Sequence, residues 1–126
     1  MNVPGAACAV ALSAPVDARV AAPASKSVTN RMLVTAALAT GDSVLLDALD
    51  SDDSRAMAAA VEALGAAVAA ERRAWRVAGT AGRLRAPPQP IDVALSGTAL
   101  RFVTALATLA PGPVVVTGHP PRRRRP

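Results

Sequence analysis

The sequence predicts an α/β fold, and two observations lead to this prediction. Apolar segments of helical length alternate along the chain with short runs of Val, Leu and Ala that are typical of buried strands. The order of polar turn, apolar helix, tight turn and apolar strand also occurs twice, with a shift of 70 residues that places Arg31 on Arg101 and residues 44–46 on residues 114–116. Such a repetition indicates an α/β architecture built by duplication of one unit.

The first part of the chain predicts two extended segments and a helix. The extended segments cover residues 8–12 and 18–21. The helix is expected over residues 27–40, because Pro23 disfavours helix before it and Ser25 can cap its first free amides. The residues that follow this cap are apolar on all sides, which predicts a helix that is buried all round.

The remaining elements follow from caps, breakers and short apolar runs. Ser51 or Asp52 can cap a second helix that ends at Leu64, with Gly65 as its stop signal. Proline and glycine mark residues 79–90 as a loop. Strands are expected over residues 43–46, 66–70, 74–78, 91–93 and 114–117, and a third helix over residues 98–109.

Size and composition limit the possible functions. The 126 residues suffice for one modest domain, and the core must be built from Ala, Val and Leu because the chain has one Trp, one Phe and no Tyr. The net charge of +5 suits an anionic partner, either a nucleic acid or a phosphorylated metabolite. The near absence of aromatic side chains argues against stacking on single-stranded nucleic acid, so we expect no nucleic-acid partner.

Cysteine and histidine occur once each. A disulfide within the chain and a Cys/His metal cluster are therefore both excluded, and Cys8 is interpreted as a small thiol that is either buried or inert. No stretch is long and apolar enough to span a bilayer, and residues 6–14 lack the preceding positive charge of a signal peptide. We expect a cytoplasmic protein that does not bind membranes.

The polar start of the first helix is a candidate anion site. Ser27 and Arg31 lie four residues apart, as do Lys26 and Asn30, so the two pairs occupy neighbouring faces of one helical turn. The free amides and the dipole at a helix N-terminus favour an anion, and an ammonium, a hydroxyl and a guanidinium strengthen this preference. Lys26 is the only lysine beside 13 arginines. The plainer interpretation is a solvated, capped helix start.

The start of the third helix, S-G-T-A-L-R from Ser96 to Arg101, is a second candidate. Gly97 allows a ligand to approach the backbone closely, and Thr98 can act as the cap. The free amides of this helix start can hold an anion, although the segment is also compatible with an ordinary helix start.

The basic tail, residues 117–126, allows more than one interpretation. Its four consecutive arginines form either a solvated end or a patch for nucleic acid or a membrane surface. His119 has no evident partner in the sequence, and we assign it no catalytic role.

Three motifs together carry a resemblance to a known family. They are P-A-S-K-S-V-T-N-R-M-L at residues 23–33, A-A-L-A-T-G at residues 36–41 and L-D-S-D-D-S-R at residues 49–55. The joint pattern resembles the N-terminal part of the 5-enolpyruvylshikimate-3-phosphate synthase family. The resemblance implies transfer of the enolpyruvyl group of phosphoenolpyruvate to the 5-hydroxyl of shikimate 3-phosphate, with release of phosphate and without a metal or cofactor.

The same resemblance assigns roles to individual residues. It implies that Lys26 is catalytic and lies between the two substrates. The chain departs from the family pattern at three positions. Leu95 replaces Asn, which removes a side-chain hydrogen bond, and Ser96 replaces Ala, which places a hydroxyl near the pocket where it could alter inhibitor response. Arg122 replaces Met in the segment T-G-x-P-x-M-x-x-R-P. The implied ligands are Lys26, Ser27 and Arg31 for shikimate 3-phosphate and Lys26, Gly97 and Arg125 for phosphoenolpyruvate, with support from Asp52, Thr98 and Arg101.

The resemblance also implies a fold and a domain organisation. Family members are longer and monomeric, with two domains that each contain three βαβαββ units arranged as an inside-out α/β barrel with the helices inside. Residues 1–126 would form part of the N-terminal domain, about one and a half units, and residues 1–20 would be a strand region packed against the second domain. We therefore expect a fragment that is inactive alone.

Three alternatives stay open at this point. The sister enzyme that transfers enolpyruvyl to UDP-N-acetylglucosamine has K-N where this chain has Lys26 and Ser27, so it fits less well. A small nucleic-acid-binding protein is the second alternative, based on Arg122–Arg125. The third is a partly folded fragment without function, whose exposed strand edges would favour aggregation.

Overall fold

A computed structural model describes residues 14–71 and 74–119 of the chain. From residue 26 onward its elements confirm the predicted order of helices and strands, with boundaries that differ from the predicted ones by at most two residues. The helices are α1 (Lys26–Leu38), α2 (Asp52–Ala63) and α3 (Gly97–Ala107), and the strands are β1 (Asp42–Leu46), β2 (Ala67–Ala70), β3 (Ala74–Ala78), β4 (Ile91–Asp92) and β5 (Val116–Thr117).

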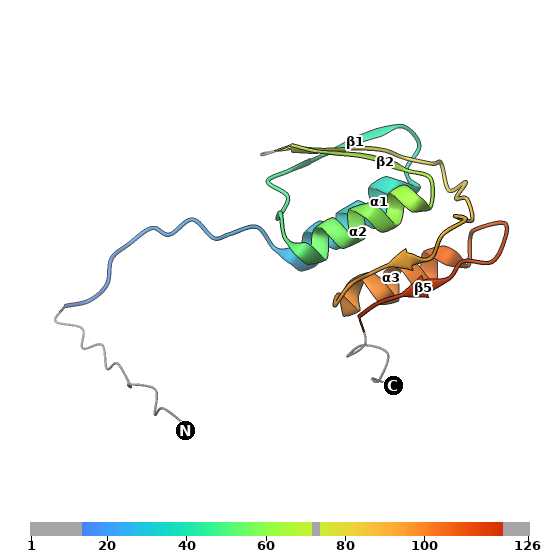
Figure 1. Ribbon diagram of the computed structural model, residues 1–126. Helices are drawn as coiled ribbons and strands as arrows, with labels where there is room; N and C mark the ends of the chain where they lie inside the picture. Colours follow the sequence, from blue (N-terminus) through green and yellow to red (C-terminus); the bar gives the residue numbers. More distant parts are fainter. Residues whose placement is uncertain (1–13, 72–73, 120–126) are drawn as a thin grey trace, which may run out of the picture.

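The strands form two small sheets on opposite sides of the helices. The larger sheet has the order β1-β3-β2 and is antiparallel throughout, and β4 pairs with β5 in parallel. The larger sheet covers α1 and α2 on one side, and α3 with β4 and β5 lies on the other side of these helices (Figure 1). The predicted α/β class is therefore confirmed at the level of mixed helix and strand content.

The core lies where the larger sheet faces α1 and α2. Trp75 and Val77 of β3 point toward the helices and are buried, whereas Arg76 between them is exposed, as the alternation of side chains along a strand requires. Leu33 of α1 and Met57 of α2 are fully buried on the helix side. Small residues such as Ala37 and Ala60 fill the space between the helices, as the composition predicts.

Two predictions at the N-terminal side are wrong. Helix α1 is not buried all round, because Val28 is 56% and Met32 48% exposed: α2, α3 and the larger sheet cover only part of its surface. Residues 14–25 form neither helix nor strand, so the strand expected over residues 18–21 is not formed. The segment 8–12 lies outside the described residues, and the packing of residues 1–20 on a second domain stays a prediction.

The C-terminal end of α1 is held by the segment that follows β3. Thr80 donates two hydrogen bonds to the Ala37 carbonyl, from its backbone N–H (2.9 Å) and from its hydroxyl (2.8 Å). Gly79 lies so close to this end that a Cβ atom there would lie 2.7 Å from the Ala36 carbonyl oxygen and closer still to that of Ala39. This contact fixes where α1 ends and therefore how the rest of the helix is oriented.

Candidate functional site

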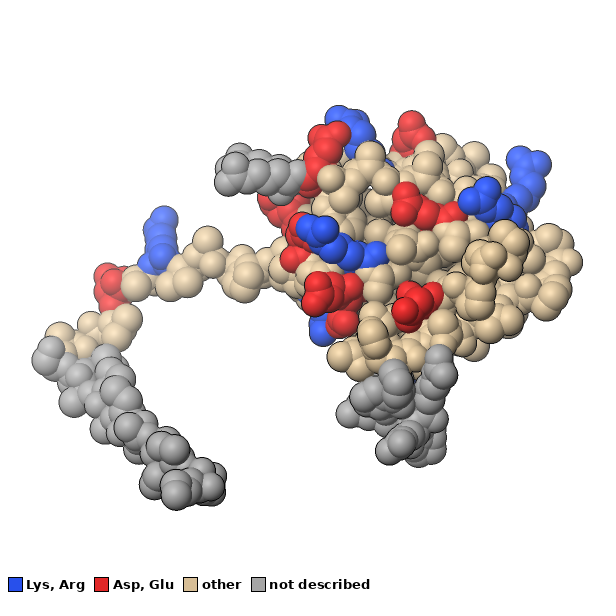
Figure 2. Space-filling view, in the orientation of Figure 1, with Lys and Arg blue, Asp and Glu red and all other residues tan. Residues whose placement is uncertain are grey.

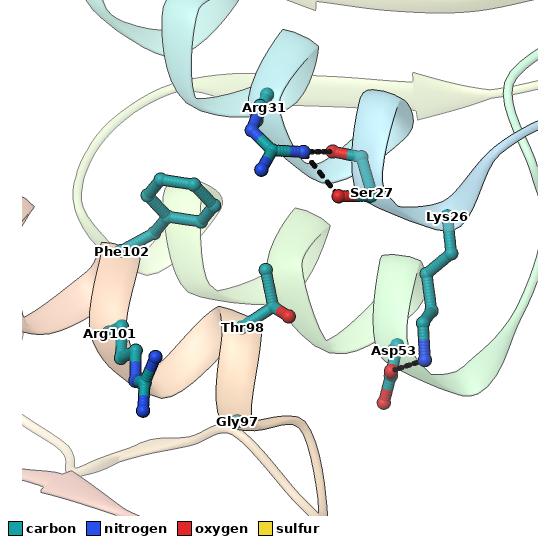
Figure 3. Close-up of a pocket in the computed structure, with 8 residues that line it drawn as sticks. All are labelled: Lys26, Ser27, Arg31, Asp53, Gly97, Thr98, Arg101 and Phe102. Atoms are coloured by element: carbon teal, nitrogen blue, oxygen red, sulfur yellow. Dashed lines mark hydrogen bonds and ion pairs between the residues drawn. The ribbon is translucent and has the colours of Figure 1, made fainter.

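The N-terminal ends of the three helices meet at one cavity of about 490 Å³. Each helix starts with a serine whose side chain accepts a hydrogen bond from the first turn: Ser25 from Val28 N (3.4 Å), Ser51 from Ser54 N (3.3 Å) and Ser96 from Ala99 N (3.1 Å). Because the positive ends of three helix dipoles point toward this place, the cavity favours an anion. The residues that line it are Lys26, Ser27, Arg31, Asp53, Gly97, Thr98, Arg101 and Phe102 (Figure 3).

Lys26 is held at the edge of this cavity by Asp53. The Lys26 ammonium lies 2.6 Å from Asp53 Oδ2, and the two side chains are 52% and 25% exposed. Lys26 is the first residue of α1 and Asp53 the second of α2, so the ion pair joins the starts of two helices. The pair positions the ammonium, while its exposure keeps the net contribution to stability at about 0–1 kcal/mol.

Ser27 and Arg31 form a second pair on the same helix. Arg31 Nη1 donates to the Ser27 hydroxyl and to the Ser27 carbonyl oxygen, the latter at 3.0 Å. These contacts follow from the spacing of four residues, which places the two side chains one above the other. The guanidinium and the hydroxyl therefore face the cavity together and can bind a phosphate or a carboxylate in concert.

Helix α3 forms the opposite wall. Thr98 and Phe102 project from α3 on the side that faces α1, and Arg101 lies next to them (Figure 3). Gly97 is the first residue of α3, so its amide belongs to the free N–H groups of that helix. Arg101 is exposed, and its side chain makes no hydrogen bond or ion pair with the described residues, which leaves a positive charge available at this wall.

Most of the residues predicted from the sequence are brought together here. Lys26, Ser27 and Arg31 face Gly97 across the cavity, with Thr98 and Arg101 beside it. Asp52 is exposed and does not line the cavity, whereas its neighbour Asp53 does, and the supporting role expected for Asp52 stays a prediction. Arg125 and Arg122 lie outside the described residues.

The cap of α3 differs from the prediction. Ser96, not Thr98, caps this helix, and its side chain is buried. The Ser96 hydroxyl is therefore engaged with the backbone and does not line the cavity, and its expected influence on inhibitor response stays a prediction. Leu95, the other departure from the family pattern, is 56% exposed.

Sequence reasoning missed Asp53 and Phe102 as lining residues. Successive residues of a helix point about 100° apart, so the choice between Asp52 and Asp53 depends on where α2 lies relative to α1, which the sequence does not reveal. Phe102 has a weak signal, since it follows Arg101 and lies four residues after Thr98 on one helical face.

Asp50 and Arg55 form a further ion pair at the start of α2. Arg55 donates through Nε to Oδ1 (2.6 Å) and through Nη2 to Oδ2 (2.7 Å) of Asp50. The hydrogen bonds from Arg55 lower the pKa of the Asp50 carboxyl below its ordinary value, and the same contacts raise the pKa of Arg55. This pair does not line the anion cavity.

The charge of the described residues is nearly balanced. They contain eight Lys and Arg side chains and nine Asp and Glu side chains, because six arginines (72–73 and 122–125) lie outside them. On the face shown in Figure 2, acidic side chains lie beside basic ones and no continuous basic surface forms. The described residues therefore do not form the continuous basic stripe that is typical of an extended nucleic-acid surface on this face.

Two further kinds of feature are absent from residues 14–71 and 74–119. No three or more His, Cys, Asp or Glu side chains in these ranges are arranged to hold a metal ion. Within the same ranges, no helix has the length and apolar character needed to cross a bilayer.

Comparison with known proteins identifies similar chains. The sequence matches the family described as EPSP synthase (3-phosphoshikimate 1-carboxyvinyltransferase) over residues 10–126. It is 45% identical over 112 residues to a 3-phosphoshikimate 1-carboxyvinyltransferase of Methanospirillum hungatei, with coverage of 89% of this chain and 26% of that protein. It is 49% identical over 111 residues to the protein of that name from Halobacterium salinarum, covering 88% of this chain and 26% of that protein.

A solved structure agrees with these matches at the level of the fold. The EPSP synthase from Acinetobacter baumannii superposes with a TM-score of 0.77 at 24% identity, covering 82% of this chain and 24% of that chain. The present chain therefore spans about a quarter of the length of the curated relatives that it matches.

Proposed function

The chain belongs to the EPSP synthase (3-phosphoshikimate 1-carboxyvinyltransferase) family, and on this basis we propose that its cavity binds shikimate 3-phosphate and phosphoenolpyruvate for enolpyruvyl transfer. The observation that carries the proposal is the meeting of three helix N-termini at one cavity, with Lys26 and Arg31 on one wall and Gly97 on the other. Both substrates are small anions, and preorganised cations and free amides are the groups that bind them and stabilise charge that develops during transfer.

In the proposed arrangement each wall binds one substrate. Ser27 and Arg31 bind the phosphate of shikimate 3-phosphate, which replaces the contacts that these two side chains now make with each other. The amide of Gly97 binds phosphoenolpyruvate, with Arg125 as a further ligand. Lys26 lies between the two substrates and is the catalytic residue, positioned by Asp53.

The proposal extends to the architecture of the longer protein. The observed order α1, β1, α2, β2, β3 followed by β4, α3, β5 supports an inside-out α/β barrel of βαβαββ units, of which this chain supplies about one and a half. We also propose that the complete enzyme is monomeric and cytoplasmic and that it binds no nucleic acid. The chain alone is expected to be inactive, because its cavity is open to solvent at Lys26 and its relatives are about four times as long.

Ligand titration of the 126-residue chain tests this proposal. We expect shikimate 3-phosphate and phosphoenolpyruvate to shift the backbone amide signals of Ser27 and Gly97 in NMR spectra, and UDP-N-acetylglucosamine and random DNA to leave them in place. Arg31→Leu should weaken binding of shikimate 3-phosphate at least about tenfold, since a charge-assisted contact is lost. The matched control is Arg83→Leu, which removes the same charge from an exposed loop residue outside the cavity.

Two outcomes would contradict the proposed binding. The first is the absence of any shift at Ser27 and Gly97 with millimolar substrate. The second is an equal loss of affinity in Arg31→Leu and Arg83→Leu, which would indicate a general charge effect. Product formed by the isolated chain from both substrates would refute the expected inactivity and would support the assigned reaction.

A further inference from the structure

Asn30 of α1 is an exception among the buried polar residues of the described chain. Its side chain has no exposed surface, and neither Oδ1 nor Nδ2 has a hydrogen-bond partner within the described residues. The other three buried polar side chains are bonded: Thr29 accepts from Leu49 N (3.0 Å), Ser54 donates to the Leu49 carbonyl (2.5 Å), and Ser96 accepts from Ala99 N (3.1 Å). The unpaired amide therefore needs a separate explanation.

The position of Asn30 relates it to the anion cavity. It lies four residues after Lys26 and three after Ser27, so all three share one side of the helix. Side chains of a helix lean toward its N-terminus, and the Asn30 side chain therefore points toward the turn that carries Lys26 and Ser27. Those two residues line the cavity, whereas Asn30 lies one helical turn further along α1 and is not itself part of the lining.

Packing alone does not account for an amide at this place. An unpaired buried polar group is unfavourable, whereas an apolar side chain of similar size at the same position would carry no such cost. Leucine has the same branching and the same number of side-chain heavy atoms, and it would also be a better helix former. Asn30 therefore lowers the stability of the folded chain when no ligand is bound. Residues that reduce stability in this way are typical of sites that act in binding or catalysis.

We propose that Asn30 is a positioning residue of the anion cavity, unpaired when the cavity is empty and hydrogen-bonded when an anion is bound. An anion competes with Asp53 for the Lys26 ammonium and separates Arg31 from Ser27, which rearranges the first turn of α1. The Asn30 amide oxygen can then accept from Lys26, and its N–H groups can donate toward the ligand. The inference rests on the proposed function, because the anion is the one proposed there.

NMR of the side-chain amides tests the inference directly. The chain contains two asparagines and one glutamine, Asn2, Asn30 and Gln89, so its spectrum has only three side-chain amide pairs. Titration with phosphoenolpyruvate, and separately with inorganic phosphate, should shift the Asn30 pair together with the Gly97 backbone amide. The Asn2 and Gln89 pairs serve as internal controls that should not move.

Substitution of Asn30 provides an independent readout. Asn30→Leu should raise the Tm of the ligand-free chain by roughly 4 °C, because it removes an unpaired polar group. The same variant should weaken binding of phosphoenolpyruvate about tenfold. Thr35→Leu, on the exposed side of α1, is the matched control. It should neither raise the Tm of the ligand-free chain nor weaken binding of phosphoenolpyruvate.

The outcomes separate this inference from the proposed function. A shift of Gly97 without a shift of the Asn30 side chain would overturn the inference and leave the proposed function intact. A lower Tm with unchanged affinity in Asn30→Leu would show a purely structural role and would also overturn it. If neither Gly97 nor Asn30 responds to either anion, both the proposed function and the inference are wrong.

Discussion

The two ends of α1 are stabilised in opposite ways. At the C-terminal end, Thr80 bonds the Ala37 carbonyl twice, and Gly79 lies against the carbonyl groups of the last turn without space for a side chain. At the N-terminal end, Ser25 caps the helix and Thr29 accepts a hydrogen bond from Leu49 N, but the contacts beside the cavity are polar side-chain pairs that solvent can reach, Lys26 with Asp53 and Arg31 with Ser27. The comparison indicates that one end fixes the helix and that the other can exchange its contacts for those of a ligand.

The largest effect is expected at the C-terminal end. A Cβ atom at Gly79 would overlap the Ala39 carbonyl and lie 2.7 Å from that of Ala36, and backbone oxygens cannot move aside as a flexible side chain can. Gly79→Ala should therefore lower the free energy of unfolding by about 3 kcal/mol, measured by urea denaturation. The change removes no ligand group from the cavity.

The control for this prediction is a second glycine of the same loop. Gly82 has a φ of +73°, but a Cβ atom added there would meet no other atom within 4 Å, so Gly82→Ala adds only backbone strain. Its expected cost is about 1 kcal/mol. Equal losses in the two variants would contradict the assignment of Gly79 as a close-packing site.

The difference between the two ends also explains which features the sequence could predict. The caps Ser25 and Ser51 and the stop at Gly65 depend on neighbouring residues only, and the structure confirms them. The contact of Gly79 with α1 joins segments far apart in the sequence, and no local pattern reports it. Sequence reasoning therefore located the elements but not the contact that orients α1.

The candidate site follows the same rule. Lys26, Ser27 and Arg31 lie within two turns of one helix, so their proximity could be predicted from spacing. Asp53 and Phe102 join the cavity through the packing of α2 and α3 against α1, which depends on tertiary structure. The burial of α1 was overestimated because an apolar sequence does not reveal how many neighbours cover a helix.

A smaller effect is expected at the N-terminal end. Asp53→Asn removes a negative charge from the anion cavity and should strengthen binding of inorganic phosphate about threefold at low ionic strength. The free energy of unfolding should change by less than about 1 kcal/mol, since the ion pair with Lys26 is exposed. Isothermal titration calorimetry and urea denaturation measure the two quantities.

Asp52→Asn is the matched control for this prediction. It removes the same charge one residue earlier in α2, from a side chain that is exposed and does not line the cavity. Its effect on phosphate affinity should be less than that of Asp53→Asn, while its effect on stability should be similar, because both carboxylates lie in the first turn of α2. Weaker phosphate binding in Asp53→Asn would contradict the competition between the carboxylate and the anion.

The smallest effect is expected for the charges that stabilise the start of α2 without facing the cavity. Hydrogen bonds from Arg55 lower the pKa of Asp50, so the folded state favours the ionised carboxylate. The stabilisation is therefore present above the unfolded pKa of Asp, near 3.8, and is lost as the pH falls through the lower folded value. Asp50→Asn should lower the Tm slightly at about pH 6, and this difference should shrink as the pH falls below 3.8 and the carboxylate of the parent chain becomes protonated. A Tm difference that persists at acidic pH would show that Asp50 acts through packing rather than through its charge. The N-terminal ends of the helices would then be stabilised by more than polar contacts that a ligand can replace.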